Sequence, residues 1–294
     1  MNKIKAYDVI IVIVMVLLVF FCLAPIFLLL MSSLTDNSTL MREGYSFFPE
    51  VFSLDAYEYL LQRGEKIFRA YYMSFVVTGV GTVVSMVLTT TLAYAISRSG
   101  LPGKTFLTFF VLLTFLFNGG LVPTYLMYTS IIDIKDTILA QIVPNLLVRA
   151  FHVLLMRSFF LTNLPGEVLD AAAVDGAGEF RIFWNIALPM SKPIIATVFL
   201  FQMIMYWNDW QNGLYFITKD LDLYTIQNLL NQMIKEIQYL ASSSTGSETA
   251  ALFEMPSQSV RMAIAVIGII PIGVIYPFIQ KNFVKGITIG AVKG

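Results

Sequence analysis

Apolar residues are concentrated in six blocks that are long enough, or nearly long enough, to cross a lipid bilayer as helices. About 20 apolar residues of helix are needed to span the roughly 30 Å of hydrocarbon in a membrane. The six blocks lie at residues 9–31, 72–96, 105–128, 137–160, 193–207 and 260–279. This pattern predicts an all-α integral membrane protein with six transmembrane helices.

The third and fourth of these blocks contain proline and asparagine within the apolar run. The third block is expected to break at Asn118-Gly119-Gly120 and again at Pro123, and the fourth contains Pro144 and Asn145. Irregular backbone at membrane depth is tolerated only where protein or a water-filled cavity satisfies its polar groups. The second block is rich in Gly, Ser and Thr, which let helices approach closely, so we expect it to pack against protein.

Lysine and arginine are distributed unevenly between the two sides of the predicted bundle. An even number of spans puts both termini on one side, where the short connecting segments are dense in basic residues. The loops 33–69 and 212–259 on the other side are longer and hold many acids. The positive-inside rule therefore places both termini in the cytoplasm. An amphipathic surface helix is predicted in the second of these outer loops, at 223–240.

These observations divide the chain into three regions. Residues 1–70 hold the first helix and an extracellular loop, and residues 71–281 form a core with five helices and a cytoplasmic loop at 161–193. Residues 282–294 are predicted to form a cytoplasmic tail.

The composition agrees with a membrane protein and excludes several classes of function. Apolar residues make up 57% of the chain and charged residues 13%, whereas soluble domains have about 45–50% and about 25%. The net charge of zero gives no indication of a nucleic-acid partner. Cys22 is the only cysteine, so an intramolecular disulfide is excluded. One histidine and no cluster of metal ligands argue against a metal site and against a membrane-embedded enzyme.

The cytoplasmic stretch LDAAAVDGAGEFRIFWNIALP, residues 169–189, differs from the apolar blocks around it. A short helix is predicted over 167–174, with Gly176 in the left-handed conformation that ends a helix. The small side chains of this helix suit close docking on another protein. The same composition suits an ordinary helical hairpin resting on lipid headgroups, and the residues alone leave both interpretations open.

A second helix is predicted immediately after this one. It covers residues 178–187 and is stopped by Pro189. Phe180, Phe183, Trp184 and Ala187 lie three and four residues apart, which predicts one apolar face that packs back onto the membrane helices.

The same stretch resembles the coupling motif of ABC importer permeases, which reads Glu-Ala-Ala, three residues, Gly, nine residues, Ile, any residue, Leu-Pro. Asp170 stands where the family has glutamate, which keeps the charge and shortens the side chain by one carbon. The resemblance implies that this loop docks on an ATPase subunit. The residues that it assigns to ATPase coupling are Asp170, Ala171, Ala172, Asp175, Gly176, Ala177, Ile186, Leu188 and Pro189.

Other stretches resemble the carbohydrate branch of this family, and together they extend the resemblance over essentially the whole chain. They lie at 119–125, 207–210, 255–257 and 260–261, and in a C-terminal stretch made of 283–286 and 290–294. The last is similar to the tail of the maltose-permease G subunit and its relatives, which in that family reaches into the ATPase dimer. The resemblance therefore implies tail contacts at Lys285, Gly286, Lys293 and Gly294.

The resemblance implies a type I ABC importer permease fold in the bacterial cell membrane, in a subunit that is not itself an enzyme. The implied partners are a second homologous permease subunit, two ATPase subunits, an extracellular sugar-binding protein, a saccharide and the lipid bilayer. ATP and Mg would be bound by the ATPase subunits, with no cofactor on this chain. The sequence has no GxxxxGK[ST] phosphate-binding loop, which agrees with this division.

Polar and aromatic residues at membrane depth are costly unless they face protein or a cavity. A buried cation at Arg149 would suit an acidic sugar. The alternatives are an interfacial aromatic belt for the tryptophans and hydrogen bonding between helices for Asn145 and Arg149. The substrate-path candidates are Asn118, Asn145, Arg149, Tyr206, Trp207, Asn208, Asp209 and Gln211.

Two other transport functions remain to be weighed. The loop motif alone also permits an ABC permease for another solute class. A stand-alone transporter driven by an ion gradient would be expected to show inverted repeats and paired membrane carboxylates. No repeat is visible in the sequence, and Asp209 is the only acid near a predicted span.

Overall fold

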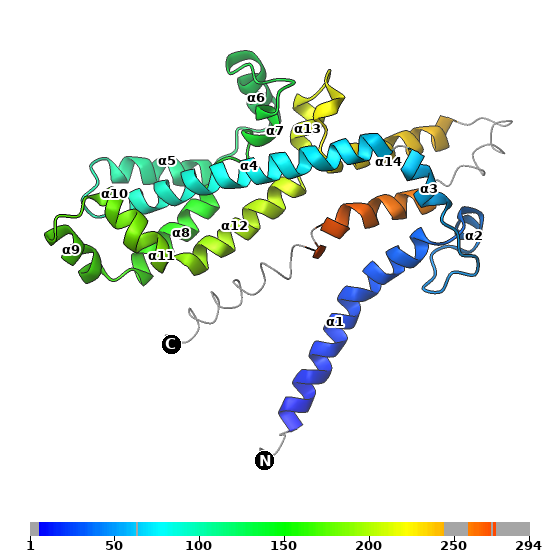
Figure 1. Ribbon diagram of the computed structural model, residues 1–294, viewed down its shortest axis with the longest axis horizontal. Helices are drawn as coiled ribbons and strands as arrows, with labels where there is room; N and C mark the ends of the chain where they lie inside the picture. Colours follow the sequence, from blue (N-terminus) through cyan, green and yellow to red (C-terminus); the bar gives the residue numbers. More distant parts are fainter. Residues whose placement is uncertain (1–5, 63, 244–257, 272, 275–294) are drawn as a thin grey trace. The chain divides into compact units, whose positions relative to one another are not determined.

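The computed structural model describes residues 6–62, 64–243, 258–271 and 273–274. The named elements in these ranges are all helical, and the one extended feature is an isolated bridge between Thr35 and Phe52. The chain forms two compact units, residues 1–68 with 229–271 and residues 69–228 with 272–294. Figure 1 labels the helices of both units. The functional division at residues 70 and 281 stays a prediction.

The first unit begins with the long helix α1 (Ala6–Ser33). Its side chains from Val9 to Phe21 are apolar and exposed on all sides. A helix that is apolar all round belongs in a protein core or in lipid, so α1 agrees with the predicted span at 9–31.

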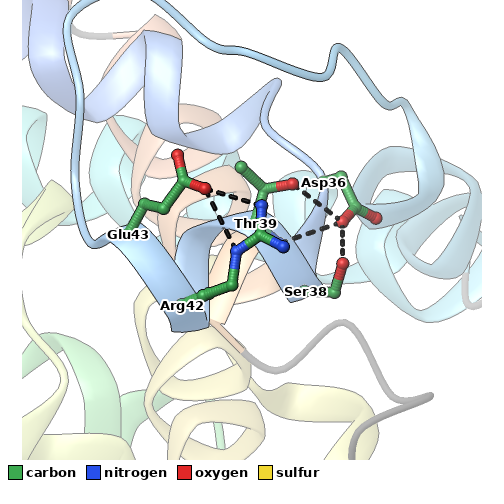
Figure 2. A network of polar contacts seen from close by, with 5 residues as sticks. All are labelled: Asp36, Ser38, Thr39, Arg42 and Glu43. Atoms are coloured by element: carbon green, nitrogen blue, oxygen red, sulfur yellow. Dashed lines mark hydrogen bonds and ion pairs between the residues drawn. The ribbon is translucent and has the colours of Figure 1, made fainter.

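The start of α2 (Asn37–Glu43) is fixed by a side-chain cap, shown in Figure 2. Asp36 Oδ2 accepts hydrogen bonds from Ser38 Oγ at 2.5 Å and from the backbone N–H of Thr39 at 3.1 Å. These bonds favour the charged carboxylate and lower the pKa of Asp36. The unit also contains α3 (Asp55–Gln62) and the helix Gln258–Pro271, whose first N–H donates to Asn37 Oδ1 at 3.0 Å.

The second unit is built around α4 (Gly64–Ser97), which begins before the predicted start at residue 72. Together with α8 (Ala150–Asn163) and α12 (Lys192–Trp207), it supplies most of the main apolar core. The small-residue face of α4 is buried, which confirms the prediction that this helix packs against protein. The buried small residues include Ser74, Thr78, Gly81, Thr82, Ser85, Thr89 and Thr90.

The third apolar block forms α5 (Lys104–Leu116), α6 (Leu121–Leu126) and a π-helical turn, η1 (Met127–Ile131). The chain leaves the helix between α5 and α6, and Gly120 has a φ of +84°. The break expected at Asn118-Gly119-Gly120 is therefore confirmed. The second break, expected at Pro123, is wrong, because Pro123 lies in the first turn of α6, where no N–H is needed for a helical hydrogen bond.

The fourth apolar block is not one helix. It contains only α7 (Leu139–Ile142) and α8, separated by residues 143–149, which we call the interrupted segment. Pro144 has no N–H to donate, and Asn145 adopts a φ of +59°, in the left-handed region. The expectation of one continuous span at 137–160 is therefore wrong.

The fifth block forms α12, close to its predicted bounds, and is followed by α13 (Gln211–Phe216) and a 3-10 turn, η3 (Leu221–Leu223). The amphipathic helix predicted at 223–240 is confirmed as α14 (Ile226–Ser243). Within the sixth block, residues 275–279 lie outside the described residues.

Two helices in the described ranges are long and apolar enough to cross a membrane, Val9–Ser33 and Gly64–Ser97. A third candidate is the pair Glu179–Met190 and Lys192–Trp207, which is bent by 82°. The apolar helices Lys104–Leu116 and Gln258–Pro271 are shorter. The chain is thus a helical membrane protein, and the count of six spans stays a prediction.

Candidate functional site

The short helix α9 (Gly166–Val174) ends in a hydrogen-bonded stop, as predicted. Gly176 has a φ of +81°, its N–H donates to Ala173 O at 3.1 Å, and the N–H of Ala177 donates to Ala172 O at 3.0 Å. These two bonds form a Schellman motif, which satisfies the last carbonyls of a helix. The left-handed position suits glycine, because it has no Cβ to clash with the backbone.

Most of α9 faces away from its own unit. Leu169 is buried, and Ala172 and Ala177 pack against the core beside it. Asp170 and Ala171 are exposed, and Val174 is 88% exposed. The helix therefore presents alanines, valines and the carboxylates of Glu167 and Asp170 to its surroundings.

The second helix of this hairpin is continuous past its predicted end. It runs through α10 (Glu179–Ile182), the π-helical turn η2 (Phe183–Ala187) and α11 (Leu188–Met190), so the stop expected at Pro189 is wrong. Pro189 lies one residue before the last residue of this helix, Met190. The chain turns instead at Ser191, before α12. We call residues 166–190 the α9–α11 segment.

The predicted apolar face of this second helix is only half correct. Phe183 and Ala187 are buried, together with Ile182, and they pack into the main core. Phe180 and Trp184 are 76% and 51% exposed. These two rings are exposed over half of their surface or more, so the α9–α11 segment presents aromatic side chains as well as alanines.

A second candidate region lies where the fourth block is interrupted. Tyr206 Oη donates to Ile142 O at 2.9 Å, Asn212 Nδ2 to Pro144 O at 2.9 Å, and Gln202 Nε2 to Leu146 O at 2.6 Å. These carbonyls lie at the break, where the helical ladder ends and other donors are required. Side chains of α12 and α13 therefore hold the irregular backbone in place.

Gln202 also links the interrupted segment to α8. Its Oε1 lies 2.8 Å from His152 Nδ1, and both side chains are fully buried. Since Gln202 Nε2 is used on a carbonyl, its Oε1 accepts, and His152 carries the proton on Nδ1. This bond makes His152 a structural residue.

Two polar side chains at the interrupted segment take no part in holding it. Asn145 is exposed at the left-handed position, and Arg149, half-buried, directly precedes the first residue of α8. Within the described part of the chain, the Arg149 guanidinium forms no hydrogen bond or ion pair. A buried or half-buried cation without a partner is available to an anion.

Residues 5–289 match the family described as "Binding-protein-dependent transport system inner membrane component". The chain belongs to this family. It is 34% identical over 294 residues to the "Polygalacturonan/rhamnogalacturonan transport system permease protein YtcP" of Bacillus subtilis (strain 168), covering 99% of this chain and 100% of that one. It is 35% identical to "Protein LplC" of the same organism, covering 92% of this chain and 89% of that one.

A solved structure shares the fold of this permease. It is described as a bacterial ABC transporter involved in the import of the acidic polysaccharide alginate. The TM-score is 0.78 at 26% sequence identity, and the match covers 96% of this chain and 100% of that one. The chain therefore has an ABC importer permease fold and is a transport subunit of the bacterial inner membrane, not an enzyme.

The permease uses several of its predicted substrate-path residues for internal packing. Tyr206 and Trp207 are buried, and the Trp207 ring packs against Tyr71 and Phe75 at centroid distances of 6.4 and 5.3 Å. Asn118 Oδ1 accepts from the N–H of Gly120 at 2.8 Å. These residues therefore make contacts that hold the fold together.

The remaining candidates lie near the end of α12. Asp209 Oδ2 accepts from the N–H of Asn212 at 3.3 Å, close to the start of α13. Asn208 and Gln211 are exposed. The tail residues Lys285, Gly286, Lys293 and Gly294 lie outside the described residues, as does the stretch 255–257.

The sequence interpretation did not single out the amides that hold the break. Gln202 is the one amide within α12, and a polar residue in a span normally has a partner within the protein. Nothing in the local sequence around Asn212 indicates its role, because the carbonyl that it binds, at Pro144, is 68 residues away in the chain.

Proposed function

We propose that the chain forms one half of the translocation pathway of an ATP-driven importer for oligosaccharides or polysaccharide fragments. The observation that carries this proposal is the similarity along nearly the whole chain to a permease named for polygalacturonan and rhamnogalacturonan transport. The likeness to an alginate importer, over a similar extent, supports the same class of solute.

In this proposal the chain crosses the membrane six times, with both termini and the α9–α11 segment in the cytoplasm. The uneven distribution of basic residues supports this orientation. Asp170 and Asp175 are exposed, and placing their carboxylates in hydrocarbon would be costly, which agrees with a cytoplasmic position.

The α9–α11 segment would couple the permease to an ATPase subunit. Small side chains let a helix enter a groove until the backbones nearly touch, and Ala171 is exposed for such contact. Asp170 and Asp175 would fix the register by pairing with basic groups, and Phe180 and Trp184 would add apolar contact. ATP-driven closure of the ATPase dimer would then move this segment and the helices packed against it.

The complete importer would contain a second homologous permease subunit, two ATPase subunits and an extracellular sugar-binding protein. ATP and Mg would be bound by the ATPase subunits, and this chain would bind no cofactor. The tail at 282–294 would contact the ATPase dimer.

The saccharide would pass the interrupted segment. The hydrogen bonds that hold this segment do not use the side chains of Asn145 and Arg149. An amide suits the hydroxyl groups of an acidic sugar, and a cation suits its carboxylate groups. Arg149 would therefore favour uronate-containing saccharides over neutral ones.

The test is uptake by the complete complex, co-purified with its partners and reconstituted in proteoliposomes. Labelled oligogalacturonates and neutral oligosaccharides of equal length are compared in the presence of ATP. Ala171→Trp is expected to abolish substrate-stimulated ATP hydrolysis and uptake, whereas Ala171→Ser, which keeps the residue small, is expected to retain both. No saccharide uptake by the wild type, or full coupling in Ala171→Trp, would refute the proposal.

Charge recognition is tested in the same assay. Arg149→Ala is expected to lower uptake of the acidic saccharide about tenfold or more, the value of a hydrogen bond to a charged group. Arg149→Lys, which keeps the charge, should lower uptake of the acidic saccharide by a smaller factor. An equal loss for acidic and neutral saccharides would remove Arg149 from substrate recognition.

A further inference from the structure

Glu179, the first residue of α10, forms its side-chain hydrogen bonds with residues at the end of α4, more than 80 positions away in the chain. Its Oε2 accepts a hydrogen bond from Tyr94 Oη at 3.0 Å, and its Oε1 accepts one from Arg98 Nη2 at 3.1 Å. Tyr94 lies in the last turn of α4, and Arg98 directly follows that helix. Both oxygens of one carboxylate are thus used to join the α9–α11 segment to the end of α4.

The α4 side of this bridge is held firmly. The Tyr94 ring is buried and packs against Phe183 and Phe160 at centroid distances of 5.0 and 5.9 Å. Arg157 Nε of α8 donates to Ile96 O at 3.2 Å, which ties the same end of α4 to α8. Because packing fixes the Tyr94 ring, its hydroxyl is a fixed point at the end of α4, to which the Glu179 carboxylate, with its side chain 63% exposed, is hydrogen-bonded.

The other contacts of α10 are of a different kind. Ile182 and Phe183 pack into the core through apolar surface, which has no directional preference. A cavity of about 480 Å³, lined in part by Leu101, Pro102 and Phe180, lies beside the bridge. Packing on that side is therefore incomplete. Among the residues that the structure describes, the Glu179 bridge supplies the hydrogen bonds between α10 and the end of α4.

We propose that Glu179 is a positioning residue that transmits the movement of the α9–α11 segment into α4. This inference rests on the proposed function, in which the segment is moved by an ATPase subunit. The apolar contacts of Ile182 and Phe183 hold α10 on the core but contain no hydrogen bond to α4. The two hydrogen bonds fix the position of α10 along α4. A displacement of α9 therefore also displaces α4, whose buried face consists of closely packed small residues.

The experiment compares uptake per ATP hydrolysed in the reconstituted full complex. Glu179→Gln is expected to lower this ratio about threefold to tenfold, with normal co-purification of the partners, because one neutral amide replaces a doubly bound carboxylate. Glu65→Gln is the matched control. Glu65 is exposed in the first turn of α4, outside the α9–α11 segment, and has no hydrogen bond or ion pair to the residues that the structure describes, so the ratio should not change.

Combined variants separate positioning from direct contact with a partner. In a Tyr94→Phe, Arg98→Gln background, Glu179→Gln should cause no further loss, because the bridge is already absent. The exchange Arg98→Glu with Glu179→Arg should restore the ratio above that of either single variant. Additive losses and no rescue would show that Glu179 acts elsewhere and would overturn the inference.

The outcomes also distinguish this inference from the proposed function. Wild-type uptake that is lost in Ala171→Trp but unchanged in Glu179→Gln would overturn only the positioning role. A wild-type complex without saccharide uptake would overturn the proposed function, whatever the behaviour of Glu179.

Discussion

Gly81→Ala is expected to destabilise the permease, whereas Gly79→Ala, two residues earlier in the same helix, is not. A Cβ placed on Gly81 would lie 2.6 Å from Cε1 and Cζ of Tyr206. A Cβ placed on Gly79 would meet no atom within 4 Å. Both positions are in the middle of α4, so the two variants differ mainly in this contact.

The Tyr206 ring has little freedom to move away. It is 1% exposed, and its hydroxyl donates to Ile142 O at 2.9 Å. Carbon atoms in contact lie about 3.5–4.0 Å apart, so relief needs a shift of about 1 Å. Such overpacking costs about 1–3 kcal/mol, and the gain in helix propensity from glycine to alanine is about 1 kcal/mol at either position. The two variants should therefore differ in stability by about 1–3 kcal/mol.

The measurement is thermal unfolding of the purified complex in detergent, with uptake as a second readout. Gly81→Ala should unfold at a lower temperature than Gly79→Ala and transport less, since a displaced Tyr206 no longer holds the break at Ile142. In a Tyr206→Leu background, which removes the ring, Gly81→Ala should cost less than it does alone. Equal stability of the two alanine variants would refute the close packing of α4 against α12.

The remaining predictions concern two positions outside the helices. Gly176→Ala should destabilise the α9–α11 segment by about 1–2 kcal/mol, because alanine is strained at a φ of +81°. Gly178→Ala is the control and should not destabilise it, because Gly178 has a φ of −70°. Equal melting temperatures and equal coupling of the two variants would contradict this prediction. The N–H groups of Lys219 and Thr218 lower the pKa of Asp136 below its usual 3.8, so its charge contributes stability that is present above pH 3.8 and lost as the pH falls through the lowered pKa. Asparagine also tolerates the left-handed backbone at this position, so Asp136→Asn tests the charge. The variant should be less stable than wild type at pH 7, and the difference in stability should shrink below pH 3.8. A difference in stability that does not depend on pH would exclude the charge as its cause.

The features predicted correctly depend on local sequence. The small residues of α4, the break at Asn118-Gly119-Gly120 and the left-handed stop at Gly176 follow from the conformational and steric properties of glycine, serine and threonine. The amphipathic helix α14 follows from the spacing of its apolar residues. Each of these signals lies within one or two helical turns of chain.

The features predicted wrongly depend on partners that are distant in the chain. Pro144 lies in an apolar block that looks continuous, and the break there is stable because Asn212 and Gln202 satisfy the freed carbonyls. Phe180 and Trp184 have the spacing of a packed face, but in the folded chain Phe183 and Ala187 are buried while these two rings remain exposed.

The sequence by itself determined that the chain is a helical membrane protein, where its apolar blocks lie and which segment resembles a coupling motif. These properties follow from apolar length, local backbone preference and residue spacing, which need no knowledge of other parts of the chain. Only the tertiary structure decided which side chains hold the interrupted segment and which residue joins the α9–α11 segment to α4. The physical reason is that a hydrogen bond such as that between Tyr94 and Glu179, 85 residues apart, has no counterpart in local sequence and exists only once the helices have packed.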